Sequence, residues 1–215
     1  MPLLQLNLSQ NLGQVHKSLI ILACFIFPFI ALGQKQVGMQ QYYYWQQKTM
    51  GTIVPKVYYQ SPENWYGELR YNYEETETAS VHFGKKFAFK KFSALEIIPV
   101  GGIIFGKLNG SSIGSIVEIN LNKFCFCSEP QYVFSFNQKE KNYFYSWTEA
   151  SYEIFSFFYA GLALQQTKPF SLPNLFEPGV MGGFSIKNFD IPVYCFNPTS
   201  SSKNFVLGVN WRWEK

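Results

Sequence analysis

Residues 64–83 read NWYGELRYNYEETETASVHF, and the first half of this stretch alternates strictly between two kinds of side chain. Such a period of two is typical of an extended strand whose two faces meet different surroundings. In a soluble sandwich the aromatic face packs inward, whereas in an outer-membrane barrel it faces lipid and the charges face the lumen. The pattern alone is compatible with both. One face carries Trp65, Gly67, Leu69, Tyr71 and Tyr73, and the other carries Glu68, Arg70, Asn72 and Glu74.

The composition narrows the class of protein. Aromatic residues make up 19% of the 215 residues, charged residues only 15%, and the formal net charge is +4. No basic cluster suggests a nucleic-acid partner. A mean hydropathy of −0.07 excludes a bundle of membrane helices. The same value is compatible with a membrane β-barrel, because half of its strand positions are polar.

The N-terminal segment predicts export. SLIILACFIFPFIALG, at 18–33, has the length and the small-residue end of a signal peptide, so we expect residues 1–33 to be removed and Gln34 to become the first residue. A membrane anchor is the main alternative, although the run is shorter than the roughly 20 residues of a spanning helix. Lipidation at Cys24 is a second alternative, but apolar sequence continues beyond that cysteine.

The cysteines predict neither a disulfide framework nor a metal site. The expected mature chain keeps Cys125, Cys127 and Cys195, an odd number. C-x-C without a nearby histidine or a second pair is a poor metal site. There is also no glycine-rich phosphate loop. We therefore expect no metal and no cofactor.

The alternation recurs along the chain and predicts an all-β fold. Long polar connections alternate with tighter ones, which is typical of outer-membrane barrels. The prediction is a closed antiparallel up-and-down transmembrane β-barrel of about ten strands, with eight or twelve as alternatives, formed by residues 63–215. Residues 34–62 lack a clean period and are predicted to be an N-terminal periplasmic extension. The ten predicted strands are 64–74, 78–86, 94–106, 113–123, 129–137, 143–153, 156–166, 178–187, 189–196 and 204–213.

Aromatic residues near the strand ends favour the membrane barrel over the soluble alternative. Tyrosine and tryptophan form girdles at both membrane interfaces of such barrels. A soluble barrel would need to cover the same aromatic surface in some other way. The residues assigned to these girdles are Trp65, Tyr71, Tyr73, Tyr143, Tyr145, Tyr159, Trp211 and Trp213.

Several stretches also resemble known proteins. They are ALGQ at the end of the predicted signal, PKVYYQSPENWYGELRYNYEETETAS, FYAGLALQQTK, GFSIKNFDIPVYCFNP and FVLGVNWRW. With these stretches the chain resembles small outer-membrane β-barrel proteins of Gram-negative bacteria, and more closely a group of them from gliding and gut-type bacteria. The resemblance covers most of 55–213 and implies a barrel in the outer membrane, with no assigned activity. The C-terminal Trp213-Glu214-Lys215 departs from the usual terminal aromatic residue.

Both arginines of the chain lie on the first and last predicted strands, which must pair if the barrel closes. Each stands beside a carboxylate on the same face, and an arginine fork is well suited to pairing with a carboxylate. We therefore predict a lumen charge network that helps to lock closure between 64–74 and 204–213. Its members are Glu68, Arg70, Glu118, Arg212 and Glu214.

A second group of lumen residues could in principle do chemistry. A barrel enzyme that modifies lipids could use a histidine with a serine and a carboxylate. His82 is the single histidine of the expected mature chain, and Glu149 and Glu153 share its predicted lumen face. No sequence context marks a nucleophile, so we predict hydrogen-bonded lumen residues and no enzyme.

Three functional classes follow from this reading. The first is a structural or surface-binding role in the cell envelope, with the loop at 167–178 extracellular and Phe170, Leu175 and Phe176 as its contacts. The alternatives are a small-solute pore, disfavoured because narrow barrels are filled by side chains, and a secreted lipocalin-like calyx for an apolar ligand. The expected partners are outer-membrane lipid, the barrel assembly machinery and an unknown surface ligand, but no nucleic acid. The barrel is expected to be a monomer.

Overall fold

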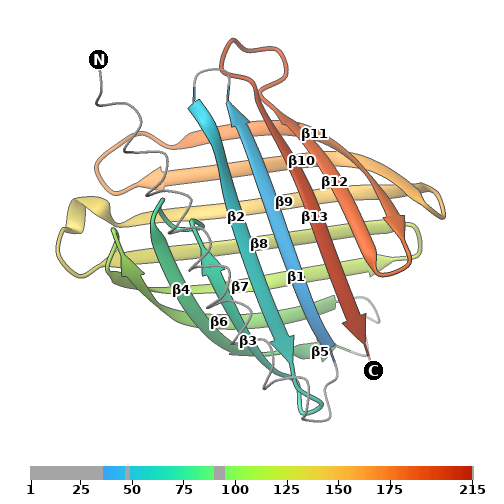
Figure 1. Ribbon diagram of the computed structural model, residues 1–215, viewed down its shortest axis with the longest axis horizontal. Coiled ribbons are helices and arrows are strands. Elements are labelled where there is room, and N and C mark those ends of the chain that lie inside the picture. Colours follow the sequence, from blue (N-terminus) through green and yellow to red (C-terminus); the bar gives the residue numbers. More distant parts are fainter. Residues whose placement is uncertain (1–35, 47–48, 90–94, 215) are drawn as a thin grey trace, which may run out of the picture.

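The computed structural model describes residues 36–46, 49–89 and 95–214 (Figure 1). The predicted signal peptide and its cleavage site lie outside these residues. In the described part of the chain, no helix is long and apolar enough to cross a membrane. Apart from a 3₁₀ turn at Lys139–Lys141 (η3), the regular structure described here is extended.

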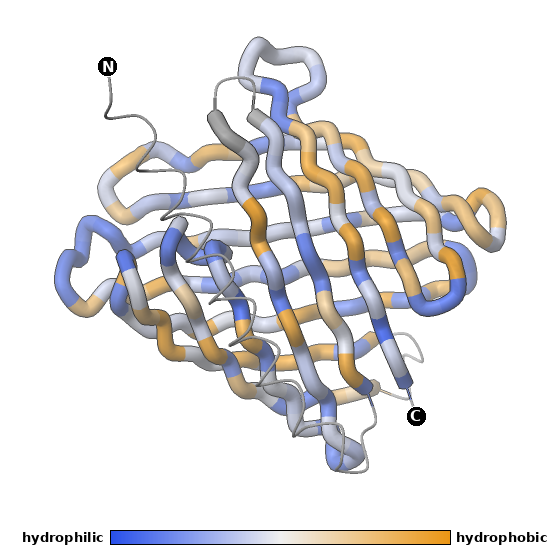
Figure 2. The backbone as a smooth tube through the Cα atoms, viewed as in Figure 1, coloured by the Kyte–Doolittle hydropathy of each residue, from blue (hydrophilic) through white to orange (hydrophobic). Residues whose placement is uncertain are grey.

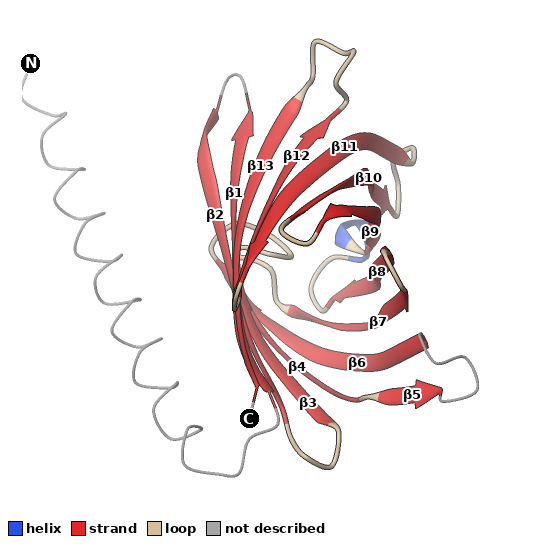
Figure 3. Ribbon diagram, turned by 90° about the vertical axis from the view of Figure 1, so that its right-hand side faces the viewer, coloured by secondary structure: helices blue, strands red, loops and turns tan. Residues whose placement is uncertain are grey.

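The strands form one antiparallel sheet that closes on itself (Figures 1 and 3). β13 pairs with β1, and β4 pairs with β6, so twelve strands complete the ring. The short β5 pairs with the beginning of β6, just beyond the part of β6 that pairs with β4. The strands are β1 (Gln36–Gln46), β2 (Thr49–Gln60), β3 (Trp65–Tyr71), β4 (Thr78–Lys85), β5 (Phe87–Phe89), β6 (Leu95–Gly106), β7 (Gly110–Leu121), β8 (Phe124–Ser135), β9 (Tyr143–Phe155), β10 (Phe158–Pro169), β11 (Leu175–Ile186), β12 (Phe189–Phe196) and β13 (Asn204–Glu214).

The predicted fold class is confirmed, and the strand number is the upper one of those expected. All ten predicted segments contain a strand of the barrel. The two further barrel strands, β1 and β2, come from residues 36–60, which had been predicted to be a periplasmic extension. Tyrosine explains why they were missed. Tyr42 and Tyr44 face the lumen while Tyr43 lies on the opposite face, so aromatic residues occupy both faces and the alternation disappears.

The barrel closes at a different pair of strands from the one predicted. β13 pairs along its whole length with β1, from Gln36 opposite Glu214 to Gln46 opposite Asn204. β3 pairs with β2 and β4 instead. The predicted pairing of 64–74 with 204–213 is therefore wrong, because β1 and β2 lie between these two strands.

Loop lengths distinguish the two ends of the barrel. Turns of two residues, at 122–123, 156–157 and 187–188, lie at the end where β1 begins and β13 ends, although the connection from β4 to β6, which contains β5, is longer. The opposite end carries longer connections, including 72–77 and 136–142. Longer loops mark the extracellular end of outer-membrane barrels, so both described chain ends lie on the periplasmic side. The loop predicted at 167–178 shortens to 170–174, because β10 and β11 extend into it, and it lies at the extracellular end.

Large apolar side chains cover the outside of the barrel. Figure 2 shows apolar and polar residues alternating along the strands. Ile113 is 63% exposed, Leu162 65% and Phe83 69%, and each comes from a different strand. So much exposed apolar surface fits a lipid environment and does not fit a soluble calyx.

Part of the predicted aromatic girdle points inward instead. Trp65 and Tyr71 are exposed on the outer face. Tyr73, in contrast, lies in the lumen, because Asn72 adopts a left-handed backbone conformation with φ of 58° and ends the alternation of β3. Tyr143, Tyr145 and Tyr159 also face the interior. In these strands, tyrosine fills the lumen rather than marking the membrane interface.

The two faces are expected to respond oppositely to charge. Leu69→Arg and Leu207→Arg would place a charge on the lipid face and should impair assembly, at about 2–4 kcal/mol each if near the bilayer midplane. Asn120→Lys, on the lumen face near the periplasmic mouth, should be tolerated. Heat-modifiable migration of the outer-membrane fraction measures the folded amount. Equal losses at both kinds of position would contradict the assigned faces.

Candidate functional site

A buried charge network occupies the lumen beside β3. The Arg70 guanidinium forms an ion pair with Glu68 and donates a hydrogen bond of 2.7 Å to Gln131 Oε1. Its Nη1 atom is 3.6 Å from Glu74 Oε1. The side chain of Arg70 is 2% exposed, and Glu68 and Glu74 are buried with it. A guanidinium stays protonated in proteins, so Arg70 carries a permanent positive charge inside the barrel, and the two carboxylates lie beside it.

Two bridges of this network run across the lumen rather than along its wall. Lys56 on β2 donates to both oxygens of Glu129 on β8, at 3.0 and 3.2 Å. Arg70 on β3 reaches Gln131 on the same distant strand. Since β2 and β3 are not neighbours of β8 in the sheet, these contacts join opposite walls. The interior is thus crossed by ion-paired polar side chains.

The loop at 72–77 folds into this network. The Tyr73 ring lies under the Arg70 guanidinium, with 4.2 Å between the guanidinium carbon and the ring centroid, and its hydroxyl donates to Glu129 at 3.3 Å. Ser80 donates to Glu74 at 2.8 Å. Asn72 accepts a 2.8 Å hydrogen bond from the Glu77 N–H, which holds the two ends of the loop together. The loop therefore acts as an inner wall of the extracellular mouth.

His82 forms a hydrogen bond of 2.6 Å between its Nε2 and Ser112 Oγ. The imidazole reaches across β6 because Gly102 lies between the two strands, and a Cβ at Gly102 would overlap the ring. A histidine beside a serine can be the base that activates a serine nucleophile. However, His82 is 0% exposed and its Nδ1, 3.8 Å from Glu68, makes no hydrogen bond. This side-chain pair is buried, and its hydrogen bond links β4 to β7 across β6.

A second cluster fills the other side of the lumen with aromatic rings. Trp147 packs edge-on against Tyr194 and Phe196, with centroids 5.0 and 5.3 Å apart. Tyr42, from β1, lies 5.8 Å from Trp147. Glu149 accepts hydrogen bonds from Tyr194, at 2.7 Å, and from the Trp147 indole. This cluster contains a buried carboxylate without a cationic partner among the hydrogen bonds and ion pairs of the described residues.

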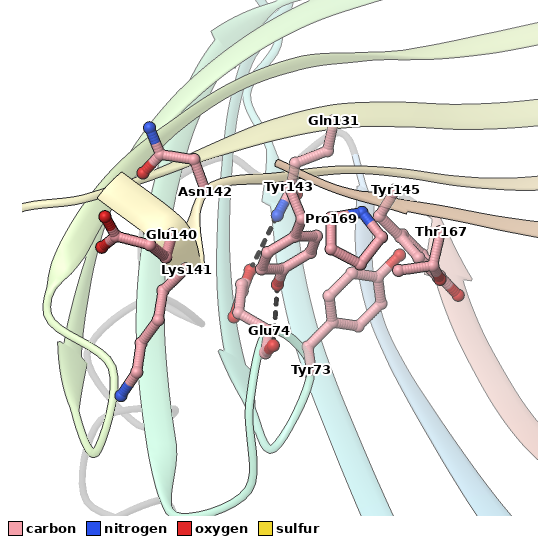
Figure 4. A pocket seen from close by; sticks show the side chains of 10 residues that line it. All are labelled: Tyr73, Glu74, Gln131, Glu140, Lys141, Asn142, Tyr143, Tyr145, Thr167 and Pro169. Carbon is pink, nitrogen blue, oxygen red and sulfur yellow. Dashed lines mark hydrogen bonds between the residues drawn. The ribbon is translucent and has the colours of Figure 1, made fainter. Parts of the chain in front are cut away.

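A pocket of about 330 Å³ opens at the extracellular mouth, above the charge network (Figure 4). Figure 4 shows three tyrosine rings, from loop 72–77 and β9, turned toward the cavity. Tyr143 donates to the Glu74 backbone oxygen at 2.7 Å and so ties β9 to loop 72–77. We call this pocket the vestibule. It is lined by Tyr73, Glu74, Gln131, Glu140, Lys141, Asn142, Tyr143, Tyr145, Thr167 and Pro169.

The structure brings together only part of the predicted charge network. Glu68 and Arg70 are paired, as expected. Arg212 lies apart from them, exposed near the periplasmic end of β13, where its side chain hydrogen-bonds with Tyr58. Arg212 lies on the last strand, β13, but β13 pairs with β1 and not with β3, the strand that carries Arg70. The predicted single network is thus two separate groups.

The other predicted site residues do not converge either. His82 belongs to the Arg70 network, Glu149 to the aromatic cluster, and Glu153 is exposed near the periplasmic turn at Lys123. Phe170, Leu175 and Phe176 are exposed at the extracellular end, at 62%, 54% and 54%. Among the described residues, no three His, Cys, Asp or Glu side chains are grouped to hold a metal ion, and Cys125, Cys127 and Cys195 are free thiols.

Sequence reasoning missed the residues that complete the network. Lys56 lies in the segment mistaken for an extension, and Glu129 and Gln131 flank Pro130 on a strand predicted to begin only at 129. The alternation of β8 would have placed Glu129 and Gln131 in the lumen. No local pattern predicts that they meet residues of β2 and β3 across the barrel.

The solved structures similar to this chain are outer-membrane barrels. The KdgM porin matches with a TM-score of 0.61 and 13% identity, over 81% of this chain and 98% of that one. The NanC porin matches with a TM-score of 0.60 and 9% identity, over 82% and 99%. The outer-membrane protein Omp33 of Acinetobacter baumannii matches with a TM-score of 0.51 and 10% identity, over 84% and 99%.

No protein-family model and no curated protein sequence matches the chain. At these identities the likeness establishes the fold and nothing finer. The fold is that of small outer-membrane β-barrel proteins of Gram-negative bacteria, and the apolar outer surface fits it to lipid. The protein is therefore located in the outer membrane.

The two arginines are expected to differ in their contribution to stability. Arg70→Met removes the cation between two buried carboxylates, and breaking such a buried pair costs roughly 3–5 kcal/mol. Arg212→Met removes an exposed charge and should change little. The temperature at which the fast-migrating folded form is lost on unheated gels measures both. A larger drop for Arg212→Met than for Arg70→Met would contradict the assignment of the network.

Proposed function

We propose that the protein is a narrow outer-membrane channel for small polar solutes, closed at its centre by a removable polar plug. The plug consists of Lys56, Glu129, Arg70, Gln131 and Tyr73. The observation that carries the proposal is the position of the vestibule directly above cross-lumen bridges that are ionic rather than apolar. Opening an apolar core is unfavourable because its side chains would be exposed to water. Ion pairs and amides, in contrast, can exchange their partners for water or for a solute.

The strand number supports this reading over a purely structural one. A pore had been disfavoured because barrels of eight to ten strands are filled by side chains. Twelve strands enclose a wider lumen, which long side chains must cross in order to close it. Similar solved structures are named as porins, and one of them is described in complex with oligogalacturonate.

The charges of the central lumen favour cationic or uncharged solutes. Four carboxylates, Glu68, Glu74, Glu129 and Glu149, face two cations, Lys56 and Arg70. Rings of carboxylates attract cations and repel anions in a low-dielectric passage. The tyrosine rings of the vestibule offer flat apolar faces beside hydrogen-bonding groups, which suits a small solute with both kinds of surface.

Removing the Lys56–Glu129 bridge should open the channel. In the double variant Lys56→Met with Glu129→Gln both charges are lost together, so neither is left unpaired. Single-channel conductance in planar bilayers is expected to rise clearly above that of the wild-type protein. The matched control is Lys107→Met with Glu75→Gln, which removes an exposed ion pair of 3.6 Å outside the lumen.

Either of two results would decide against the channel. If wild type and both variants form no conducting openings, the cross-lumen bridges brace the walls and the role is structural. If both double variants raise conductance equally, the effect does not come from the lumen. A structural role is the second candidate function, because the same bridges tie β2 and β3 to β8.

The channel is also expected to prefer cations. With a KCl gradient across the bilayer, the reversal potential of the Lys56→Met, Glu129→Gln channel should have the sign of potassium selectivity, because three central carboxylates remain against one cation. Adding Glu149→Gln should reduce that potential. An anion-selective channel, or a potential unchanged by Glu149→Gln, would show that the solute path avoids these carboxylates.

A further inference from the structure

A row of prolines and serines crosses four neighbouring strands near the middle of the barrel wall. Pro99 on β6 is opposite Ser115 on β7, and Pro130 on β8 is opposite Ser146 on β9. Between β7 and β8, Gly114 pairs with Gln131 and Val117 with Ser128, but the two positions between them are not paired. These positions are Ser115 with Pro130, and Ile116 with Glu129.

Proline explains the interruption. In an antiparallel sheet the N–H and C=O of one residue point to the same neighbouring strand. The β6–β7 ladder continues through the pair of Pro99 and Ser115 although Pro99 has no N–H, so this pair is not one that exchanges backbone hydrogen bonds. The N–H and C=O of Ser115 therefore point to the other neighbouring strand, β8, toward Pro130. Pro130 has no N–H, and the Ser115 carbonyl lacks a ladder donor. In the hydrocarbon layer such a group costs several kcal/mol if it finds no other partner.

The outer surface here is polar, unlike the rest of the lipid face. Ser115, Ser128 and Thr148 are partly exposed on the outer face around Pro130, and Ser146, on the same face, is 8% exposed. Ser128 Oγ and Thr148 Oγ1 are 2.9 Å apart, and Ser146 Oγ and Thr148 Oγ1 are 3.3 Å apart. Hydroxyls on the lipid face are unfavourable unless they have a partner. We call this group the hydroxyl cluster.

On the β7 side of the interruption the inner surface is apolar, whereas Glu129, opposite Ile116 on β8, faces the lumen and pairs with Lys56. Ile116 packs in a buried cluster with Tyr66, Ile98 and Val100, and Tyr58 lies against it. Ile116 is one of the two β7 residues that lack a ladder partner on β8. On β7 the usual polarity of a membrane barrel is therefore reversed at the interruption, with Ile116 inside and Ser115 outside.

A second interruption serves as a comparison. β12 and β13 are unpaired at two positions between Asp190 and Val193, and Pro192 accounts for it. The Pro192 ring is fully buried in the lumen and covers Gly208, where a Cβ would come within 2.6 Å of its Cγ. This interruption is closed from inside by packing. Of these two interruptions, only that between β7 and β8 combines missing pairs, outer hydroxyls and an apolar inner residue, Ile116.

We propose that the barrel wall opens laterally between β7 and β8 at Ser115 and Pro130, and that an uncharged, mainly apolar small molecule passes there between the inner apolar cluster and the membrane. The missing pairs lower the cost of separating the strands at this point. Ser and Thr hydroxyls can hydrogen-bond the backbone groups that separation frees, as they do at helix breaks in membranes. The Tyr66, Ile98, Val100 and Ile116 cluster then receives the apolar part of the molecule.

The test asks whether an apolar molecule in the bilayer reaches this cluster through the wall. Tyr66 is replaced by the photoreactive benzoylphenylalanine in a variant whose Cys125, Cys127 and Cys195 are serine, reconstituted in phosphatidylcholine vesicles with tritiated 1-decanol. Val117→Cys with Ser128→Cys allows a disulfide across the proposed opening, since the two residues are paired on the outer face. The matched control is Ile103→Cys with Ser111→Cys, which locks the continuous β6–β7 ladder.

Illumination is expected to attach decanol to residue 66 in the unlocked protein and in the β6–β7 control. Oxidation of the β7–β8 pair should reduce the adduct to the level without light, and a reductant should restore it. Pro130→Val, which returns an N–H to face Ser115, should also reduce it. Unheated gel migration shows that each variant is folded.

Labelling that persists through the β7–β8 lock would overturn the proposal, because decanol would then enter by the barrel ends. Loss of labelling with both locks would overturn it as well, since the effect would not be specific to the interruption. Absence of labelling in the unlocked, folded protein has the same consequence. Channel conductance is expected to be unaffected by the β7–β8 lock, so this test is independent of the proposed channel.

Discussion

The interior of this barrel depends on one positive charge that deprotonation does not remove. The Arg70 guanidinium is buried, so its charge must be balanced where it lies. Glu68 supplies one carboxylate from the same face of β3, and Glu74 supplies another only because the chain after Tyr71 turns into the barrel instead of out of it. The contact of Glu74 with Arg70 holds loop 72–77 inside the barrel. Its position in turn provides one wall of the vestibule and places Tyr73 over the central bridges.

Some of these features could be predicted from the sequence, and others could not. The faces of β3 follow from alternation, so Glu68 and Arg70 were assigned correctly to the lumen. Tyr73 was misassigned because the left-handed conformation of Asn72 reverses the faces, and no spacing rule signals it. β1 and β2 were missed because a tyrosine is acceptable both in a lumen that must be filled and at a lipid interface. The contacts of Lys56 and Arg70 with β8 depend on barrel closure, which is a long-range property.

Strand number links the fold to the function. With ten strands, side chains alone would fill the lumen, and a structural role would be the natural reading. With twelve strands the lumen is wider, so only long side chains such as those of lysine, arginine and tyrosine cross and close it. The polar groups of these side chains then need hydrogen-bond or ion-pair partners. The chain meets this need with ion pairs on one side and with stacked rings around Glu149 on the other. The lumen is thus closed by buried ion pairs, which salt screens much less than exposed ones, and by packed aromatic rings.

The pairing of β1 with β13 joins the two ends of the described chain. Gln36 lies opposite Glu214, and its side-chain amide donates a 3.1 Å hydrogen bond to that carboxylate. Because the backbone ladder of each strand joins only its two neighbours in the ring, the closed wall does not depend on where the polypeptide chain is cut. A short linker across this pair, with new ends in an extracellular loop such as 197–203, would give a circularly permuted barrel with the same set of strand neighbours. The order in which strands leave the ribosome would change, while the register that builds the lumen would not.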